Sequence, residues 1–161
     1  MKIFRSLICI CSLLCAFHAA GQTVGSAAPD FTLETFDGRK ITLSELKGKG
    51  VCIMTWASWC PYCKASMPPL YDYYQAAKKA GKNIEIVAVA IRDKPDRAKQ
   101  VYIERGLPYP TGIEDANFEK LYPSSRKTPS WIMVDRDGIV RDVTSGRVFP
   151  NDIANLFKQI E

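Results

Sequence analysis

The chain has 161 residues, of which 47% are hydrophobic and 24% charged, and its formal net charge is +5. These values are typical of a globular protein with one domain and one core, and they require no second domain. The basic residues form no block, so the positive charge predicts no nucleic-acid partner.

The first residues differ from the rest. Lys2 and Arg5 precede an uncharged, mostly apolar stretch, Ser6–Ala20, which ends in small residues. This pattern is typical of a cleaved secretory signal peptide, so we predict a signal peptide at 1–21 and a single domain at 22–161. The alternative is a retained membrane anchor, although a spanning helix usually needs about 20 apolar residues. Either outcome predicts export to the cell envelope.

Cleavage would change which reactive side chains the mature protein retains. It removes His18, which is the only histidine, together with Cys9, Cys11 and Cys15. The mature domain then keeps Cys52, Cys60 and Cys63. A Cys–His nucleophilic dyad is thereby excluded and a four-ligand zinc site is disfavoured, so we predict no metal.

A β-hairpin is expected at the start of the mature domain. Two short alternating runs between Phe31 and Leu43 flank Asp37-Gly38, a common hairpin turn, and Ser44 is the expected N-cap of a one-turn helix. The apolar run Val51–Met54 then predicts a buried strand, in which Cys52 would be an inert core residue.

Two cysteines three apart follow this strand. Pro61 suits the first position of a helix, which places Cys60 at the N-cap. The unpaired N–H groups and the helix dipole at that position favour a thiolate and would lower the pKa of Cys60, making it a nucleophile near neutral pH. Cys63, one turn further in, would be shielded and could attack a mixed disulfide.

The remaining elements alternate between strands and helices. The run 83–91 is apolar on both faces, as in a central parallel strand. Around it we expect helices from Pro61 to Gly81, from Pro95 to Gly106 and from about Asp115, then strands Ser130–Val134 and Ile139–Val143, and a last helix with Ile153, Leu156, Phe157 and Ile160 on its apolar face. This order predicts a mixed sheet covered by helices.

One proline has a special position. Thr128-Pro129 stands directly before an apolar strand, in a chain that also has the strand–cysteine–helix unit and a terminal ββα unit. This position resembles that of the cis-proline loop in the thioredoxin fold, and the resemblance implies a cis bond at Pro129, beside Cys60, although cis X-Pro bonds are uncommon. Such a proline lacks an N–H, discourages metal binding and leaves the Thr128 backbone available to pair with a substrate strand.

Together these motifs resemble those of TlpA/ResA-like thiol-disulfide oxidoreductases, in the thioredoxin and redoxin superfamily, over essentially the whole mature chain. The similar segments are Gly25–Leu33, Asp37-Gly38, Gly48-Lys49, Trp56–Cys63, Pro68, Thr128-Pro129 and Val134–Gly138. The resemblance implies an α/β, thioredoxin-like fold, with a mixed central sheet flanked by helices and an N-terminal β-hairpin extension.

The resemblance also implies a site and a reaction. Cys60 attacks and Cys63 resolves, no cofactor is needed beyond their disulfide, and the substrate groove is formed by Trp59, Pro61, Tyr62, Thr128 and Pro129. Independently of the resemblance, Arg92 and Asp93 follow the carboxyl end of the central strand, where α/β crevices open, so they either line this site or form a structural loop pair. Related proteins act on protein disulfides, including those of apocytochromes c, and receive electrons from a membrane-embedded thiol carrier. We expect a monomeric protein-disulfide reductase of this kind.

Some positions depart from the family pattern. Ser66 stands where many relatives have a glutamate, and Met54 where thioredoxin has a buried aspartate, so the base for Cys63 is unassigned; water, or a relay through Ser66, is the hypothesis. A peroxiredoxin-like peroxidase is an alternative, but Ile53 and Ala57 replace the proline and threonine of a peroxidatic motif around Cys60. The other alternative is a non-catalytic module that binds a client protein.

Overall fold

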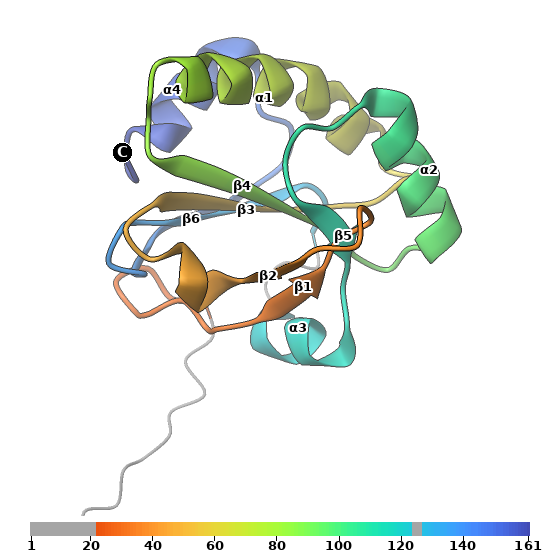
Figure 1. Ribbon diagram of the computed structural model, residues 1–161, viewed down its shortest axis with the longest axis horizontal. Coiled ribbons are helices and arrows are strands. Elements are labelled where there is room, and N and C mark those ends of the chain that lie inside the picture. The colour runs from red at the N-terminus through yellow and green to blue at the C-terminus, as the bar shows by residue number, and fades with distance from the viewer. Residues whose placement is uncertain (1–21, 124–126) are drawn as a thin grey trace, which may run out of the picture.

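The computed structural model describes residues 22–123 and 127–161, so the predicted signal peptide at 1–21 lies outside the described residues. Figure 1 shows a sheet with helices α1, α2 and α4 on one side and a β-hairpin with α3 on the other. Within the described residues no helix is long and apolar enough to span a membrane.

The elements follow one another in the expected alternation. The strands are β1 (Thr32–Glu34), β2 (Lys40–Thr42), β3 (Gly50–Trp56), β4 (Ile84–Ala90), β5 (Thr111–Ile113), β6 (Ser130–Val134) and β7 (Val140–Ser145). The helices are the 3-10 helix η1 (Leu43–Leu46), α1 (Pro61–Lys79), α2 (Pro95–Arg105), α3 (Ala116–Leu121) and α4 (Pro150–Phe157).

The central sheet is mixed, as predicted. Its strand order is β5-β4-β3-β6-β7, with β3 parallel to β4 and antiparallel to β6. The N-terminal hairpin forms a separate two-stranded antiparallel sheet, β1-β2, around the expected turn at Asp37-Gly38. The predicted thioredoxin-like architecture with its hairpin extension is therefore confirmed.

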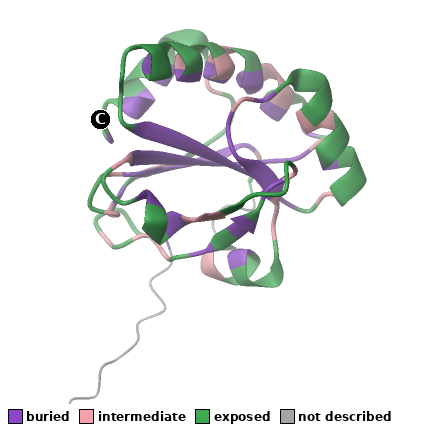
Figure 2. Cartoon of the chain, viewed as in Figure 1, coloured by how far each residue is buried: buried purple, intermediate pink, exposed green. Residues whose placement is uncertain are grey.

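The central strands are buried on both faces because helices cover one face and the hairpin side covers the other (Figure 2). In β3, Cys52 and Met54 pack in the cluster under α1, α2 and α4, whereas Ile53 packs in the cluster that includes Leu33, Leu43 and Phe118. Alternate residues of one strand thus belong to two cores. Strand β3 is fixed from both sides, and so is the loop that leaves it toward Cys60.

The hairpin lies close against the edge strand β5. Thr35 forms an isolated antiparallel bridge with Gly112, and the Phe36 N–H donates to the Thr111 carbonyl at 2.8 Å. A Cβ on Gly112 would lie 2.2 Å from the Glu34 carbonyl oxygen. Glycine is therefore required here by the close approach of two backbones, and this contact covers an otherwise open sheet edge.

One local prediction is wrong, and one strand was missed. Ser44 does not cap a helix: Thr42 holds the N-cap position of η1 without a side-chain hydrogen bond, and the Ser44 N–H donates to Asp30 Oδ1 at 2.8 Å. The oxygen that accepts a hydrogen bond from the start of this helix therefore belongs to a residue 14 positions earlier in the chain. Strand β5 was not predicted, because its three residues carry no alternating pattern long enough to indicate a strand.

Candidate active site

The two cysteines of the motif form a disulfide at the start of α1. Cys60 is the N-cap, Pro61 is the first helical residue, and the Cα atoms of Cys60 and Cys63 are 5.3 Å apart. The Cys63 N–H donates to Cys60 Sγ at 3.1 Å, so the sulfur takes the place of an N-cap oxygen. The predicted N-cap is confirmed. After reduction, this N–H and the helix dipole stabilise a Cys60 thiolate.

The two sulfur atoms differ in access. Cys60 retains 3% of its surface, whereas Cys63 has none, because it packs under the helix in the core cluster with Met67 and Leu70. A partner can therefore reach only the Cys60 side of the disulfide without moving the helix. This is the asymmetry that an attacking cysteine and a shielded resolving cysteine require.

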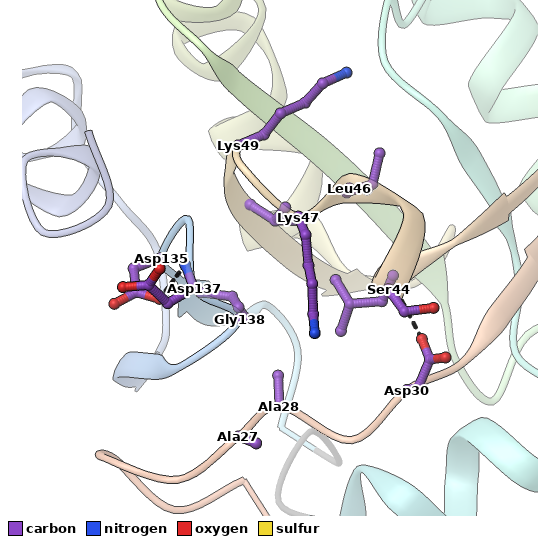
Figure 3. A pocket seen from close by; sticks show the side chains of 13 residues that line it. Ala27, Ala28, Asp30, Ser44, Leu46, Lys47, Lys49, Asp135, Asp137 and Gly138 are labelled. Carbon is purple, nitrogen blue, oxygen red and sulfur yellow. Dashed lines mark hydrogen bonds between the residues drawn. The ribbon is translucent and has the colours of Figure 1, made fainter.

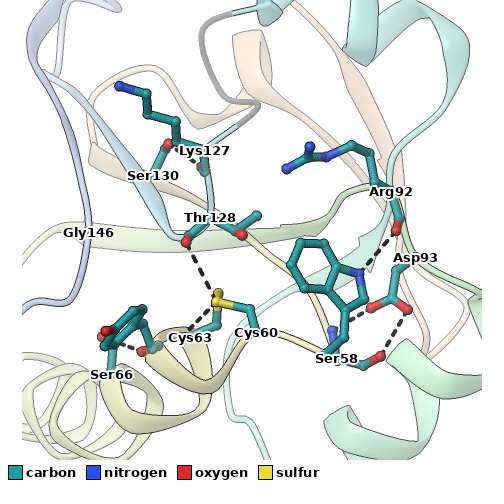
Figure 4. Close-up of a disulfide and its surroundings, with 12 residues drawn as sticks. Ser58, Cys60, Cys63, Ser66, Arg92, Asp93, Lys127, Thr128, Ser130 and Gly146 are labelled. Carbon is teal, nitrogen blue, oxygen red and sulfur yellow. Dashed lines mark hydrogen bonds between the residues drawn. A yellow bond between two sulfur atoms is a disulfide. The ribbon is translucent and has the colours of Figure 1, made fainter.

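The loop that contains the predicted cis-proline lies against Cys60 (Figure 4). The Thr128-Pro129 bond is cis, as predicted, and the Thr128 carbonyl oxygen is 3.6 Å from Cys60 Sγ, within the range for a thiol donor in the reduced protein. The Gly146 N–H donates to the Pro129 carbonyl at 2.8 Å. The β7–α4 loop thus joins the cis-proline loop at the edge of the site.

Exposed side chains surround the disulfide. Trp59 and Tyr62 expose 54% and 60% of their surfaces, and Pro61 between them is also exposed. Trp56, three residues before Trp59, is fully buried. The structure therefore brings together every predicted groove residue, Trp59, Pro61, Tyr62, Thr128 and Pro129, around Cys60.

Asp93 positions the loop before Cys60, a role that the sequence did not reveal. Its carboxylate accepts hydrogen bonds from both the backbone N–H of Ser58 and the Ser58 hydroxyl, the latter at 2.9 Å. The Trp59 indole N–H donates to the Arg92 carbonyl at 3.2 Å. The Arg92 and Asp93 pair, for which both roles were open, thus binds the active-site loop directly. The only sequence signal is its position at the carboxyl end of β4.

Arg92 itself has an unusual backbone. Its φ angle is 50°, and its N–H donates to Glu114 Oε1 at 2.6 Å. A non-glycine residue with positive φ is uncommon and is often found where a functional loop is held in place. Here the conformation turns the Arg92 carbonyl toward Trp59 and the Asp93 carboxylate toward Ser58.

Ser66 joins α1 to the β7–α4 loop. The buried Ser66 hydroxyl donates to the Tyr62 carbonyl at 2.9 Å, one turn back in the helix, and accepts a 3.4 Å hydrogen bond from the Val148 N–H. Its proton is held by a backbone oxygen of its own helix. This arrangement favours a structural role for Ser66 over the hypothesised proton relay.

Other groups lie away from the exchange chemistry. Cys52 is fully buried, and burial raises the pKa of its thiol well above the ordinary value. A pocket of about 180 Å³, across which Lys47 extends, lies at the amino-terminal end of β3, opposite the end that leads to Cys60 (Figure 3). Residues 22–123 and 127–161 contain no cluster of three or more His, Cys, Asp or Glu suited to a metal.

Comparisons with known proteins show the family and the fold. The AhpC/TSA family matches residues 24–143. The thiol-disulfide oxidoreductase ResA of Geobacillus kaustophilus is 32% identical over 86% of this chain and 78% of its own length. Two solved structures are also similar. A thioredoxin-family thiol:disulfide interchange protein from Chlorobium tepidum has a TM-score of 0.76 at 22% identity, covering 84% of this chain and 96% of its own.

The second structure is the pneumococcal exposed lipoprotein thioredoxin from Streptococcus pneumoniae. It has a TM-score of 0.67 at 28% identity, and the match covers 82% of this chain and all of the other. The family match and the ResA relative show the family, and the solved structures show the fold. The chain belongs to the AhpC/TSA family and is a thiol-disulfide oxidoreductase with a thioredoxin fold.

Proposed function

We propose that this protein is an exported, monomeric protein-disulfide reductase in which Cys60 attacks the client disulfide and Cys63 resolves the mixed disulfide. The observation that carries the proposal is the asymmetry of the pair: Cys60 caps α1 and retains surface, whereas Cys63 is fully buried behind it. A purely structural disulfide needs neither the helix N-terminus nor an accessible sulfur.

The reaction balances as two exchanges. The Cys60 thiolate attacks one client sulfur, a Cys60–client bond forms, the client disulfide breaks, and the second client sulfur leaves as a thiolate that takes up a proton. Cys63 then loses its proton and attacks Cys60 Sγ, releasing the first client sulfur as a second thiolate. The client gains two electrons and the Cys60–Cys63 pair is oxidised, so an upstream dithiol must reduce it again.

The groove residues orient this attack. An extended client segment would lie beside Thr128 and Pro129, with its sulfur in line with Cys60 Sγ and its neighbouring side chains against Trp59, Pro61 and Tyr62. Because Cys60 Sγ is 3.6 Å from the Thr128 carbonyl, a segment paired with that backbone brings its cysteine to the attacking sulfur.

Location and partners complete the proposal. The predicted signal peptide supports action in the cell envelope, and the exposed lipoprotein thioredoxin is a relative at 28% identity. In this compartment the clients are envelope proteins, among them apocytochromes c, and the donor is a membrane-embedded thiol carrier. The reaction requires no metal or other cofactor.

Trapping tests the exchange chemistry. In cells, Cys63→Ser should accumulate mixed disulfides through Cys60, because the resolving step is missing. The control Cys60→Ser should trap none, and Cys52→Ser should behave as wild type. Absence of trapped clients in Cys63→Ser would favour the non-catalytic client-binding module.

The reduction potential tests the direction. Equilibration of the mature protein with thiol/disulfide buffers should give a value near that of thioredoxin, roughly −270 mV, whereas a value near −120 mV would indicate an oxidant.

A peroxidase is the remaining alternative. We expect no thiol-dependent consumption of peroxide, because Ala57 and Ile53 take the positions of the peroxidatic threonine and proline.

A further inference from the structure

Helix α1 lacks two of its internal hydrogen bonds close to the cysteines. Pro68 and Pro69 lie inside the helix. Because proline has no N–H, the carbonyls of Lys64 and Ala65, each four residues earlier, cannot accept the usual helical hydrogen bond. Lys64 directly follows Cys63 in the chain. The first turn of α1, which holds the resolving cysteine, is therefore joined to the rest of the helix by fewer backbone hydrogen bonds than an ordinary turn.

An arginine from α2 supplies a donor to one of these carbonyls. Nη1 of Arg105 donates to the Lys64 carbonyl oxygen at 3.4 Å, across 41 positions of sequence. In Figure 1 the end of α2 accordingly lies beside the start of α1. None of the ion pairs within residues 22–123 and 127–161 includes Arg105. The guanidinium is therefore available to this carbonyl.

The end of α2 is fixed, so the side chain of Arg105 starts from a defined place. Gly106 ends the helix in the left-handed conformation, with a φ angle of 54°. The next residue, Leu107, is buried in the core cluster that also contains Cys63 and Met67. Arg105 and Met67 line the same surface hollow between the two helices. The arginine thus extends from an anchored helix end toward the first turns of α1.

The exchange chemistry depends on the shape of that first turn. The Cα atoms of Cys60 and Cys63 are 5.3 Å apart, and the Cys63 N–H donates to Cys60 Sγ at 3.1 Å. The Lys64 N–H donates to the Cys60 carbonyl at 3.2 Å. Pro68 removes the hydrogen bond that would hold the Lys64 carbonyl from within the helix, and Arg105 holds this carbonyl from outside it.

We propose, on the basis of the function proposed above, that Arg105 is a positioning residue for the resolving step. By donating to the Lys64 carbonyl it keeps the first turn of α1 in place and so holds Cys63 within reach of Cys60. Its effect passes through the backbone of Lys64 and not through contact with either sulfur. Loss of this hydrogen bond slows the attack by Cys63 and leaves Cys60 open to a client.

A disulfide reagent with a coloured leaving group separates the two steps. The Cys60 thiolate of the reduced mature protein attacks Ellman's reagent, a Cys60–nitrothiobenzoate bond forms, and one nitrothiobenzoate leaves. Cys63 then loses its proton and attacks Cys60 Sγ, and the second nitrothiobenzoate leaves; the pair is oxidised and the reagent reduced. Stopped-flow absorbance follows both releases.

Substitutions of Arg105 should change only the second release. Arg105→Met keeps most of the side-chain volume but has no donor, and we expect the second release to be about three- to tenfold slower while the first keeps its wild-type rate. Arg105→Lys, which retains a charged donor, should recover most of the lost rate. A purely structural role would lower the temperature of unfolding of Arg105→Met and leave both releases unchanged.

Two further variants test the route of the effect. Arg97→Met removes the same charge from an exposed position of the same helix and should keep the wild-type rate. Pro68→Ala restores an N–H four residues after Lys64, so the carbonyl regains a donor from its own helix. In this background Arg105→Met should have little further effect, because the two substitutions act on one hydrogen-bonded group.

The outcomes separate this inference from the proposed function. If the wild type releases only one nitrothiobenzoate, Cys63 does not resolve and the proposed function fails, whatever Arg105 does. If the wild type releases two and Arg105→Met does so at the same rates, the exchange chemistry stands and the positioning role is refuted. The role is also refuted if Arg97→Met slows the second release equally, or if Arg105→Met slows it undiminished in the Pro68→Ala background. The comparison of Arg105→Met with Arg105→Lys decides the matter even if Pro68→Ala does not fold.

Discussion

Asp93 holds Ser58 by two hydrogen bonds, one from its backbone N–H and one of 2.9 Å from its hydroxyl, across 35 positions of sequence. Ser58 lies two residues before Cys60, so the carboxylate at the end of β4 fixes the approach of the chain to the attacking cysteine. The same carboxylate also accepts from the Lys94 N–H at 2.8 Å, which orients it.

Asp93→Asn tests this relationship. The amide retains one acceptor oxygen but presents N–H groups to donors, so we expect a loss of about 1.5–3 kcal/mol in the free energy of unfolding. The rate at which Cys60 is alkylated in the reduced protein should also differ from that of the wild type, because the loop that holds Ser58 before Cys60 is less ordered. Asp72→Asn, at an exposed position in α1, is the matched control and should change neither quantity. Equal effects of the two substitutions would show that Asp93 has no special positioning role.

Ser66→Ala separates a structural link from a proton relay. Because the hydroxyl donates to the Tyr62 carbonyl, we expect about 1 kcal/mol of lost stability and a resolution rate close to that of the wild type. Stopped-flow decay of a mixed disulfide on Cys60 measures this rate across pH. A large fall in the rate, with a displaced pH profile, would instead establish Ser66 as the relay.

Gly112→Ala should separate the hairpin from the sheet. An added Cβ would lie 2.2 Å from the Glu34 carbonyl oxygen, so the backbones must move apart, at a cost of about 1–3 kcal/mol. Hydrogen exchange of the Phe36 amide, which donates to Thr111, should accelerate. Gly106→Ala, in open space at the left-handed end of α2, should destabilise the fold without this local exchange effect. Unchanged Phe36 exchange in Gly112→Ala would contradict the close contact.

Asp37 should make the stability of the hairpin depend on pH in the acid range. Hydrogen bonds from Arg39 and Thr35 lower its pKa from 3.8 to about 2. Its folded pKa lies below the unfolded one, so the contribution is present above about pH 4 and is lost as the pH falls toward 2. Because the pair is partly exposed, we expect at most about 1 kcal/mol.

Unfolding free energies of the wild type, Asp37→Asn and Arg39→Ser at pH 7, 4 and 2 measure this. Asp37→Asn should lose the whole of this contribution to the slope between pH 4 and 2, whereas Arg39→Ser should lose only part of it, since the hydrogen bond from Thr35 remains. Identical slopes in all three proteins would show that the hydrogen bonds contribute nothing to folding.

Local patterns predicted the part of the site that is local in sequence. Pro61 at a helix start dictates the Cys60 N-cap, and Asp37-Gly38 dictates the hairpin turn, because each depends on backbone preferences of adjacent residues. The cis bond at Pro129 was predicted only from the whole set of motifs. Propensity at Thr128-Pro129 alone favours the trans form.

Contacts between distant residues could not be read from such patterns. The Asp30 carboxylate accepts from the N–H of Ser44, 14 positions later in the chain, where the Ser44 side chain was expected to be the cap. Strand β5 acquires its geometry by pairing with β4 and with the hairpin. The 146–149 loop reaches Pro129 only because β7 lies beside β6 in the sheet. Nothing in residues 146–149 themselves indicates a place next to the cysteines.

The buried thiol of Cys52 provides a built-in reporter of unfolding. With no exposed surface between two layers of the fold, it is closed to alkylating reagents while the protein is native. A reduced sample of the mature protein should therefore show one readily reactive thiol, that of Cys60, when folded, because Cys63 and Cys52 have no exposed surface. Cys52 should react only after the sheet opens. Mass spectrometry after a brief alkylation pulse would then read, in one spectrum, the redox state of the active pair and the fraction of molecules that have lost their core.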